Sequence, residues 1–202
     1  LVFRAVKRYF GGWIKADMKI PSTFTSPDAP DTKTFLTKTE TESVSELRYA
    51  IRGIARNDKD FAASQILTEI LKNRMTQNGT VRNETHILPG IVIFELPNWN
   101  VGLVKIEEDK ISLPVNFSSF VADLMKNNIE SNEFDKAKTA FLNEFGKQNP
   151  MEFWLDSHTY KLSPIKDEIQ KANSIALADV QRVLDNWRKE AVTMSLVVTA
   201  PK

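Results

Sequence analysis

The sequence predicts an α+β fold, in which an antiparallel β-sheet carries helices on one face. Three observations lead to this class: strand-like segments occupy much of the first half, amphipathic stripes fill the last third, and the chain closes with a strand. The length of 202 residues is enough for a full hydrophobic core, so we expect residues 1–202 to form a single domain. The contents of 42% hydrophobic and 26% charged residues are typical of globular proteins and argue against intrinsic disorder.

A helix and a loop are expected at the start of the chain. Apolar residues at near-helical spacing predict a short helix over residues 1–10, and Gly11-Gly12 supplies a stop signal. Between Asp17 and Thr34, three prolines and several Ser, Thr and Asp residues oppose both a helix and a central strand, so this segment is predicted to be a surface loop. Position 1 is Leu rather than Met, and we expect a fragment of a longer chain.

Two strands are predicted in the stretch Lys33–Ile54, which is rich in Thr, Val, Leu, Tyr and Ile. They are expected to form an antiparallel pair that turns near Thr41–Ser43. Asn57 is expected to cap the next helix, which carries one apolar stripe and should run to about Met75.

Further strands are predicted over residues 80–87 and 91–96, on either side of Pro89-Gly90. Residues 98–113 mix strand-like alternation with helix-like spacing, so their structure stays open. Period-2 alternation predicts a closing strand over residues 192–199.

The last third of the chain is predicted to be helical. One apolar stripe lies over residues 117–125, and a second over residues 134–145 follows an expected cap at Ser131. Pro150 is expected to open a third helix, and residues 180–187 define a fourth. The aromatic residues Phe153, Trp154 and Tyr160 of the third helix are expected to belong to the core.

Zinc chemistry has little support in this chain. Only two histidines are present, His86 and His158, and they lie far apart in the sequence, whereas HExxH and HxxEH sites place two histidines four residues apart on one helix beside a Glu. One alternative is that the two histidines meet in space beside Glu84 or Asp156. The simpler interpretation is that each is a surface or hydrogen-bonded histidine. We therefore expect no metal or other cofactor in this chain.

Other classes of function are also disfavoured. Cysteine is absent, which excludes disulfides, thiolate metal sites and a cysteine nucleophile, and the sequence contains no GxSxG, GxGxxG or GxxxxGK[ST] motif. The net charge of +1 comes without a basic stripe, so nucleic acid is not an expected partner. The longest uncharged apolar run, Ile87–Phe94, is too short to cross a membrane.

Several short motifs, read in order, resemble the second, non-catalytic half of pitrilysin/insulinase-family zinc metallopeptidases. That half has a Tyr-Phe-Gly helix end, an Asp-led helix ending in an Arg-Leu pair, a Glu-Phe/Leu-x-x-Ala-Lys helix, and an Asp-Val helix before the last strand. The matching residues are Tyr9-Phe10-Gly11, Asp60 to Arg74-Met75, Glu133-Phe134 through Ala137-Lys138, and Asp179-Val180. The shared order and spacing extend over essentially the whole chain.

The resemblance implies a fold of the mitochondrial-processing-peptidase type, in which two similar halves enclose a peptide chamber and only the first half holds zinc, through HxxEH. It implies zinc in the partner domain, a peptide substrate, and a partner that is the catalytic half of the same protein or a homologous subunit. A homo-oligomer is a further expectation. The family occupies cytosol, organelles and periplasm, which leaves the compartment open, with a bacterial periplasm as one expectation.

One departure from the family pattern concerns substrate binding. Active members carry R-E-x-x-G-x-x-Y after the Arg-Leu pair, and its Arg and Tyr bind substrate. After Arg74 this chain reads MTQNGTVRNETHILPG without such a Tyr, so Arg82 is the one conceivable substrate contact. The alternative function is that of a structural or binding subunit of the same fold with no proteolytic role, like the core proteins of respiratory complexes.

Overall fold

The computed structural model describes residues 2–12, 35–39, 45–77, 84–88, 90–97, 105–107, 110–112, 117–190 and 192–199. The helices are α1 (Val2–Phe10), α2 (Phe61–Gln77), α3 (Phe117–Lys126), α4 (Ser131–Gly146), α5 (Pro150–Tyr160), α6 (Ile165–Ser174) and α7 (Leu177–Trp187). The strands are β1 (Phe35–Thr39), β2 (Ser45–Arg52), β3 (Glu84–Leu88), β4 (Ile91–Pro97), β5 (Lys105–Glu107), β6 (Lys110–Ser112) and β7 (Val192–Thr199).

The main sheet has five strands in the order β1-β7-β2-β4-β3, and β5 and β6 form a separate two-stranded ladder. All pairs are antiparallel except β1 with β7, which is parallel. The α+β class is thus confirmed, and β5 and β6 lie in the segment 98–113 whose structure the sequence left open.

The predicted pairing of the strands within Lys33–Ile54 is wrong, because β7 lies between β1 and β2. Residues 41–43 read Thr-Glu-Ser, and a tight hairpin turn needs Gly or Asn at positions of positive φ. The chain therefore lacks a local signal that would hold β1 against β2. The predicted turn itself lies outside the described residues.

The predicted connection between β3 and β4 agrees with the structure, unlike the predicted pairing of β1 with β2. Gly90 has φ +85, in the left-handed region that glycine tolerates, and register pairs Leu88 with Ile91 across the hairpin. β4 begins at the predicted residue, and each strand ends one residue beyond its predicted end. Residues 80–83 of the first predicted strand lie outside the described residues.

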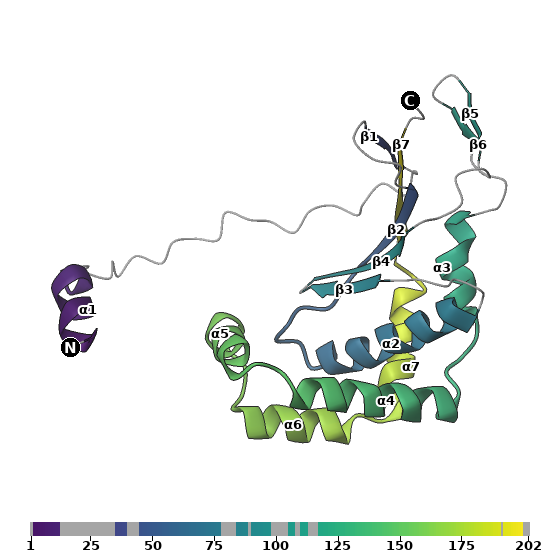
Figure 1. The fold of residues 1–202 in the computed structure, drawn as a ribbon. Helices are drawn as coiled ribbons and strands as arrows, with labels where there is room; N and C mark the ends of the chain where they lie inside the picture. Colours follow the sequence, from purple (N-terminus) through teal and green to yellow (C-terminus); the bar gives the residue numbers. More distant parts are fainter. Residues whose placement is uncertain are drawn as a thin grey trace.

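The helices of the main body lie on one side of the sheet, as Figure 1 shows for α2, α3, α4 and α7. Every second residue of the central strands faces this layer: Tyr49 and Ile51 on β2, and Val92 and Phe94 on β4, are all nearly fully buried. They join one core cluster with the apolar faces of the helices, including Ile66, Leu67, Ile70 and Leu71 of α2 and Val180, Val183, Leu184 and Trp187 of α7. The predicted arrangement of helices on one face is confirmed.

Two predicted helix caps are shifted. α2 begins at Phe61 after a turn in which the Asp60 backbone N–H donates to Asp58 Oδ1, so Asn57 does not cap it. In α4, Glu130 occupies the N-cap position and Ser131 is already helical. At both helix starts a nearby carboxylate accepts a hydrogen bond from the backbone N–H of the residue before the helix, Asp58 from Asp60 and Glu133 from Glu130.

α5 and α6 form the outer part of the helical layer. Pro150 opens α5 as predicted, and Asn149 Oδ1 accepts a hydrogen bond of 2.9 Å from the Met151 backbone N–H. Phe153 is buried, but Trp154 is 58% exposed, so its predicted place in the core is wrong. α6 was not predicted, because its apolar residues are few and Ile165 and Ile169 are themselves exposed.

Candidate functional site

One face of the main sheet carries no helix in the described part of the chain (Figure 1). Arg48, Ala50 and Arg52 alternate with the buried residues of β2, and register pairs Ala50 with Ile93 and Arg52 with Ile91 on β4. The two arginines are exposed and the other three residues are half-buried. This helix-free face is therefore a mixed surface, with aliphatic side chains between guanidinium groups.

The two histidines lie on different elements of the fold. His86 lies on β3, paired in register with Ile93, whereas His158 lies on α5. His158 Nδ1 is 2.9 Å from the carbonyl oxygen of Trp154, and its ring packs on the Trp154 ring at a centroid distance of 4.4 Å. Within the described residues, no group of three or more His, Cys, Asp or Glu side chains is placed to hold a metal. Arg82 lies outside the described residues, so its proposed role stays a prediction.

Arg74 is the centre of a dense polar network that joins three helices. Its guanidinium donates to both carboxylate oxygens of Glu133, through Nε to Oε1 at 2.8 Å and through Nη2 to Oε2 at 2.7 Å. It also donates to the carbonyl oxygens at the C-terminal end of α3, those of Leu124, Asn127 and Asn128. The hydrogen bonds from Arg74 are the main reason that the pKa of Glu133 lies below its ordinary value.

Other residues of the resemblance motifs also hold the fold together. Lys138 Nζ donates to the carbonyl oxygens of Asn173 and Ile175, which closes the C-terminal end of α6 against α4. Asp179 accepts a hydrogen bond from the Ala176 backbone N–H at the start of α7. Four of the matched motif residues, Arg74, Glu133, Lys138 and Asp179, therefore have structural roles that the sequence alone did not reveal.

An ion pair ties α7 to the start of α2. Arg182 Nη2 lies 2.5 Å from Asp60 Oδ1, and Nη1 lies 3.1 Å from Asp179 Oδ1. The hydrogen bond to Asp60 is the largest reason that the pKa of Arg182 is raised. Both terminal nitrogens of this guanidinium are thus engaged by carboxylates.

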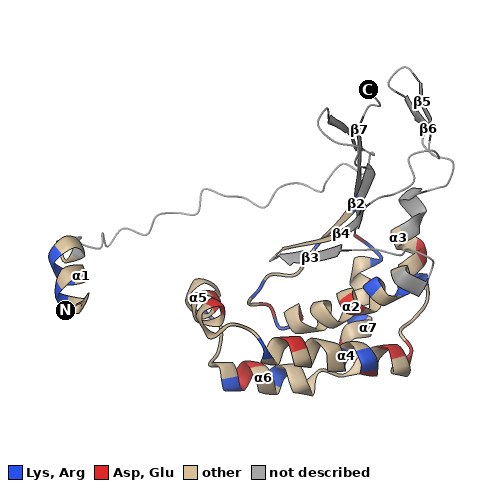
Figure 2. Cartoon of the chain, viewed as in Figure 1, with Lys and Arg blue, Asp and Glu red and all other residues tan. Residues whose placement is uncertain are grey.

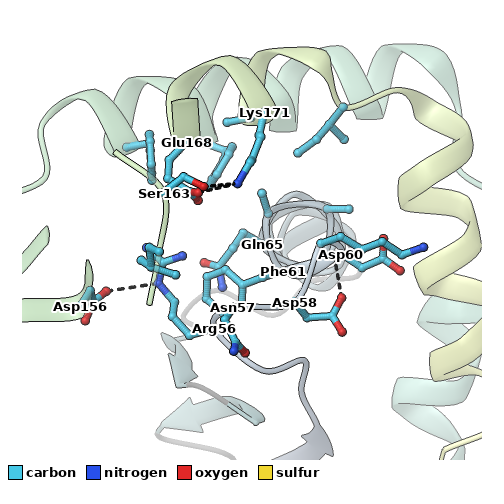
Figure 3. A pocket seen from close by; sticks show the side chains of 18 of the residues that line it. Arg56, Asn57, Asp58, Asp60, Phe61, Gln65, Asp156, Ser163, Glu168 and Lys171 are labelled. Carbon is cyan, nitrogen blue, oxygen red and sulfur yellow. Dashed lines mark hydrogen bonds and ion pairs between the residues drawn. The ribbon is translucent and has the colours of Figure 1, made fainter. Parts of the chain in front are cut away.

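A cavity of about 1090 Å³ opens in the helical layer between the start of α2, the end of α4 and the helices α5 and α6. Figure 3 shows Arg56, Phe61 and Gln65 on its wall, with a dashed line from Arg56 to Asp156. The lining includes aromatic rings, Phe61, Phe141 and Phe145, together with charged residues of both signs. Ser163 and Glu168 both accept hydrogen bonds from Lys171 on the far wall. Nothing in the sequence pattern had pointed to this cavity, because its residues come from five separate segments.

Charges of both signs are interspersed over the helical layer. Figure 2 shows acidic and basic positions mixed along α4 and α6. This mixing agrees with the absence of a basic stripe in the sequence. In the part of the chain that the structure describes, no helix is both long and apolar enough to span a bilayer.

Several solved structures share the fold of this chain at low sequence identity. A protease from Helicobacter pylori matches with a TM-score of 0.68 at 16% identity, over 98% of this chain and 51% of that one. A predicted insulinase family protease from Yersinia pestis matches with a TM-score of 0.57 at 12% identity, over 100% and 50%. A chain of complex III2 from Candida albicans matches with a TM-score of 0.55 at 11% identity, over 82% and 45%.

No protein-family model matches the sequence, and no curated protein matches it significantly. At these identities the likeness shows the fold alone, which is that of M16-like and insulinase-family peptidase domains. The chain spans about half the length of the three solved structures described above.

Proposed function

We propose that this chain is the second, non-catalytic half of a pitrilysin/insulinase-type zinc metallopeptidase, and that another domain holds the zinc. One observation carries the proposal: the chain has the fold of about half of such a protease, while its sequence lacks HxxEH. A partial peptidase fold without the ligand motif fits the half that encloses the substrate rather than the half that cleaves it.

Within the described residues, no group of side chains is placed to hold zinc. His86 on β3 and His158 on α5 belong to different layers of the fold, and the His158 ring packs on Trp154. In the family mechanism, zinc would activate water in the other half, so this chain needs no titrating side chain for the reaction. Its contribution would be to enclose and position the peptide.

The helix-free face of the sheet, defined by Arg48, Ala50, Arg52, Ile91 and Ile93, is the surface that we assign to the chamber wall. Its aliphatic side chains can contact apolar residues of an unfolded peptide, and its guanidinium groups can contact peptide carbonyls. The expected partners are the catalytic half of the same protein or a homologous subunit, with a peptide as substrate.

Zinc titration by calorimetry tests the non-catalytic assignment on the purified chain. We expect no stoichiometric binding, because no two histidines have the spacing that zinc sites require. One zinc per chain at near-micromolar affinity would contradict the proposal. The folding of the sample is checked in parallel by circular dichroism, so that a negative titration reports on the native chain.

A structural or binding subunit with no proteolytic role is the second candidate. It is supported by the likeness to a chain of complex III2. The two candidates differ in what surrounds this chain: a peptidase requires a companion domain with HxxEH, and a structural subunit does not. Cleavage assays of the longer protein separate them.

A further inference from the structure

The cavity at the start of α2 contains hydrogen-bond donors that have no acceptor among the described residues. It lies in the helical layer, whereas the surface assigned to the chamber wall is on the helix-free face of the sheet. A ligand in this cavity would therefore be separate from the peptide chamber.

Arg56 is the first of these donors. Its side chain is only 9% exposed, its Nε donates to Asp156 Oδ2 at 3.2 Å, and its guanidinium carbon lies 4.7 Å from the centre of the Phe61 ring. These contacts fix the plane of the guanidinium but use only one of its three nitrogens. Among the described residues, no acceptor binds Nη1 or Nη2, so the fork that binds a carboxylate bidentately stays open.

Gln65 is the second donor. It lies one turn after Phe61 on α2 and lines the same cavity, and its buried Nε2 has no hydrogen-bond partner in the part of the chain that the structure describes. Leaving a buried donor unsatisfied costs about 1–3 kcal/mol, and such groups in folded proteins usually have an explanation. A ligand that brings an acceptor into the cavity would remove this cost.

The remaining lining indicates what else the ligand carries. Phe141 and Phe145 of α4 present a pair of rings with centroids 5.7 Å apart, and Phe61 adds a third ring beside Arg56. A volume of about 1090 Å³ exceeds that of a single small anion. Apolar rings next to open donors suit a peptide ligand in which an apolar side chain lies beside a carboxylate.

We propose that this cavity binds a short peptide segment through a carboxylate, with Arg56 and Gln65 as donors and the three phenylalanine rings as the apolar contact. The carboxylate comes either from a C-terminus or from an acidic side chain, since both present the same two oxygens. The proposal does not depend on the proposed peptidase function, because binding is measured on this chain without any cleavage.

Four capped peptides test it. Acetyl-Gly-Gly-Phe with a free C-terminal carboxylate is compared with its C-terminal amide, and acetyl-Gly-Phe-Glu-Gly-amide with its Gln counterpart. Affinity is measured by calorimetry, and the site is located by NMR from the shifts of the side-chain N–H signals of Arg56 and Gln65. We expect at least one carboxylate peptide to bind about tenfold more tightly than its neutral counterpart and to shift both signals.

Two variants locate the binding energy. Arg56→Lys keeps the positive charge but loses the planar fork, and should weaken binding about tenfold. Arg182→Lys is the matched control, because Arg182 also lines the cavity but its terminal nitrogens are already held by Asp60 and Asp179. Arg182→Lys should change the affinity less than twofold.

Three results would overturn the proposal. They are equal affinity for the charged and neutral peptides, no binding at millimolar peptide, and unchanged binding by Arg56→Lys.

Discussion

Replacement of Arg74 by alanine should destabilise the fold more than loss of any surface ion pair. The Arg74 side chain is 11% exposed and that of Glu133 is 24% exposed. Arg74→Ala removes two hydrogen bonds to this carboxylate and three to backbone carbonyl oxygens at the end of α3. It also leaves the negative charge of Glu133 without its partner.

The size of the effect follows from these contacts. Removing one member of a buried ion pair costs about 3–5 kcal/mol, and each charge-assisted hydrogen bond contributes about 1.5–3 kcal/mol when counted alone. The contributions do not add, and water can reach the partly exposed Glu133, so we expect a loss of about 3 kcal/mol. This is a large share of the roughly 5–15 kcal/mol by which domains are stable.

Urea unfolding followed by far-ultraviolet circular dichroism measures this loss. With a slope of about 1–3 kcal/mol per molar, the midpoint should fall by about 1 M or more. Lys147→Ala is the matched control, because it breaks an ion pair with Glu144 in which the two side chains are 71% and 75% exposed, and it should leave the midpoint nearly unchanged. If both variants lose the same small amount, the account of the Arg74 network is wrong.

Two further predictions concern the same helices. Above the ordinary carboxyl pKa of 4.5, wild type should be more stable than Glu133→Gln; because the pKa of Glu133 is lowered in the folded state, this advantage should shrink as pH falls through that lowered pKa. Urea midpoints at several pH values check it, and an advantage that grows on acidification would refute it. Ala137→Leu inserts a larger side chain at a fully buried position of α4, where overpacking costs about 1–3 kcal/mol. Ala178→Leu, at an exposed position of α7, serves as its control in thermal unfolding, and equal losses would show that Ala137 is not tightly packed.

The helices of the core could be predicted because their apolar periodicity is local. The stripe of α2, including Ile66 and Leu67, and that of α7, including Val183 and Leu184, lie in the core as their spacing indicated. Pairing between strands that are distant in the sequence has no such local periodicity to predict it. The insertion of β7 between β1 and β2 joins residues more than 140 positions apart, for which neither strand carries a local signal.

The polar contacts of the fold were harder to predict from the sequence than the helices of the core. The motif residues Arg74 and Glu133 were noted only as points of resemblance, and their mutual hydrogen bonds became visible once α2 and α4 were packed together. The cavity donors Arg56 and Gln65 lie in a polar segment that reads as an ordinary helix start. A single Arg or Gln at such a position is usually solvated, so burial rather than residue type distinguishes them.

Peptide cleavage tests the central claim most directly. A mixed library of unstructured peptides is incubated with this chain alone, and then with this chain joined to the sequence that precedes it in its gene, with zinc added. We predict cleavage by the joined form only, abolished by a chelator, because this chain lacks a zinc motif. Metal-dependent cleavage by this chain alone would contradict the non-catalytic assignment, and no cleavage by either form would contradict the peptidase itself in favour of a structural subunit.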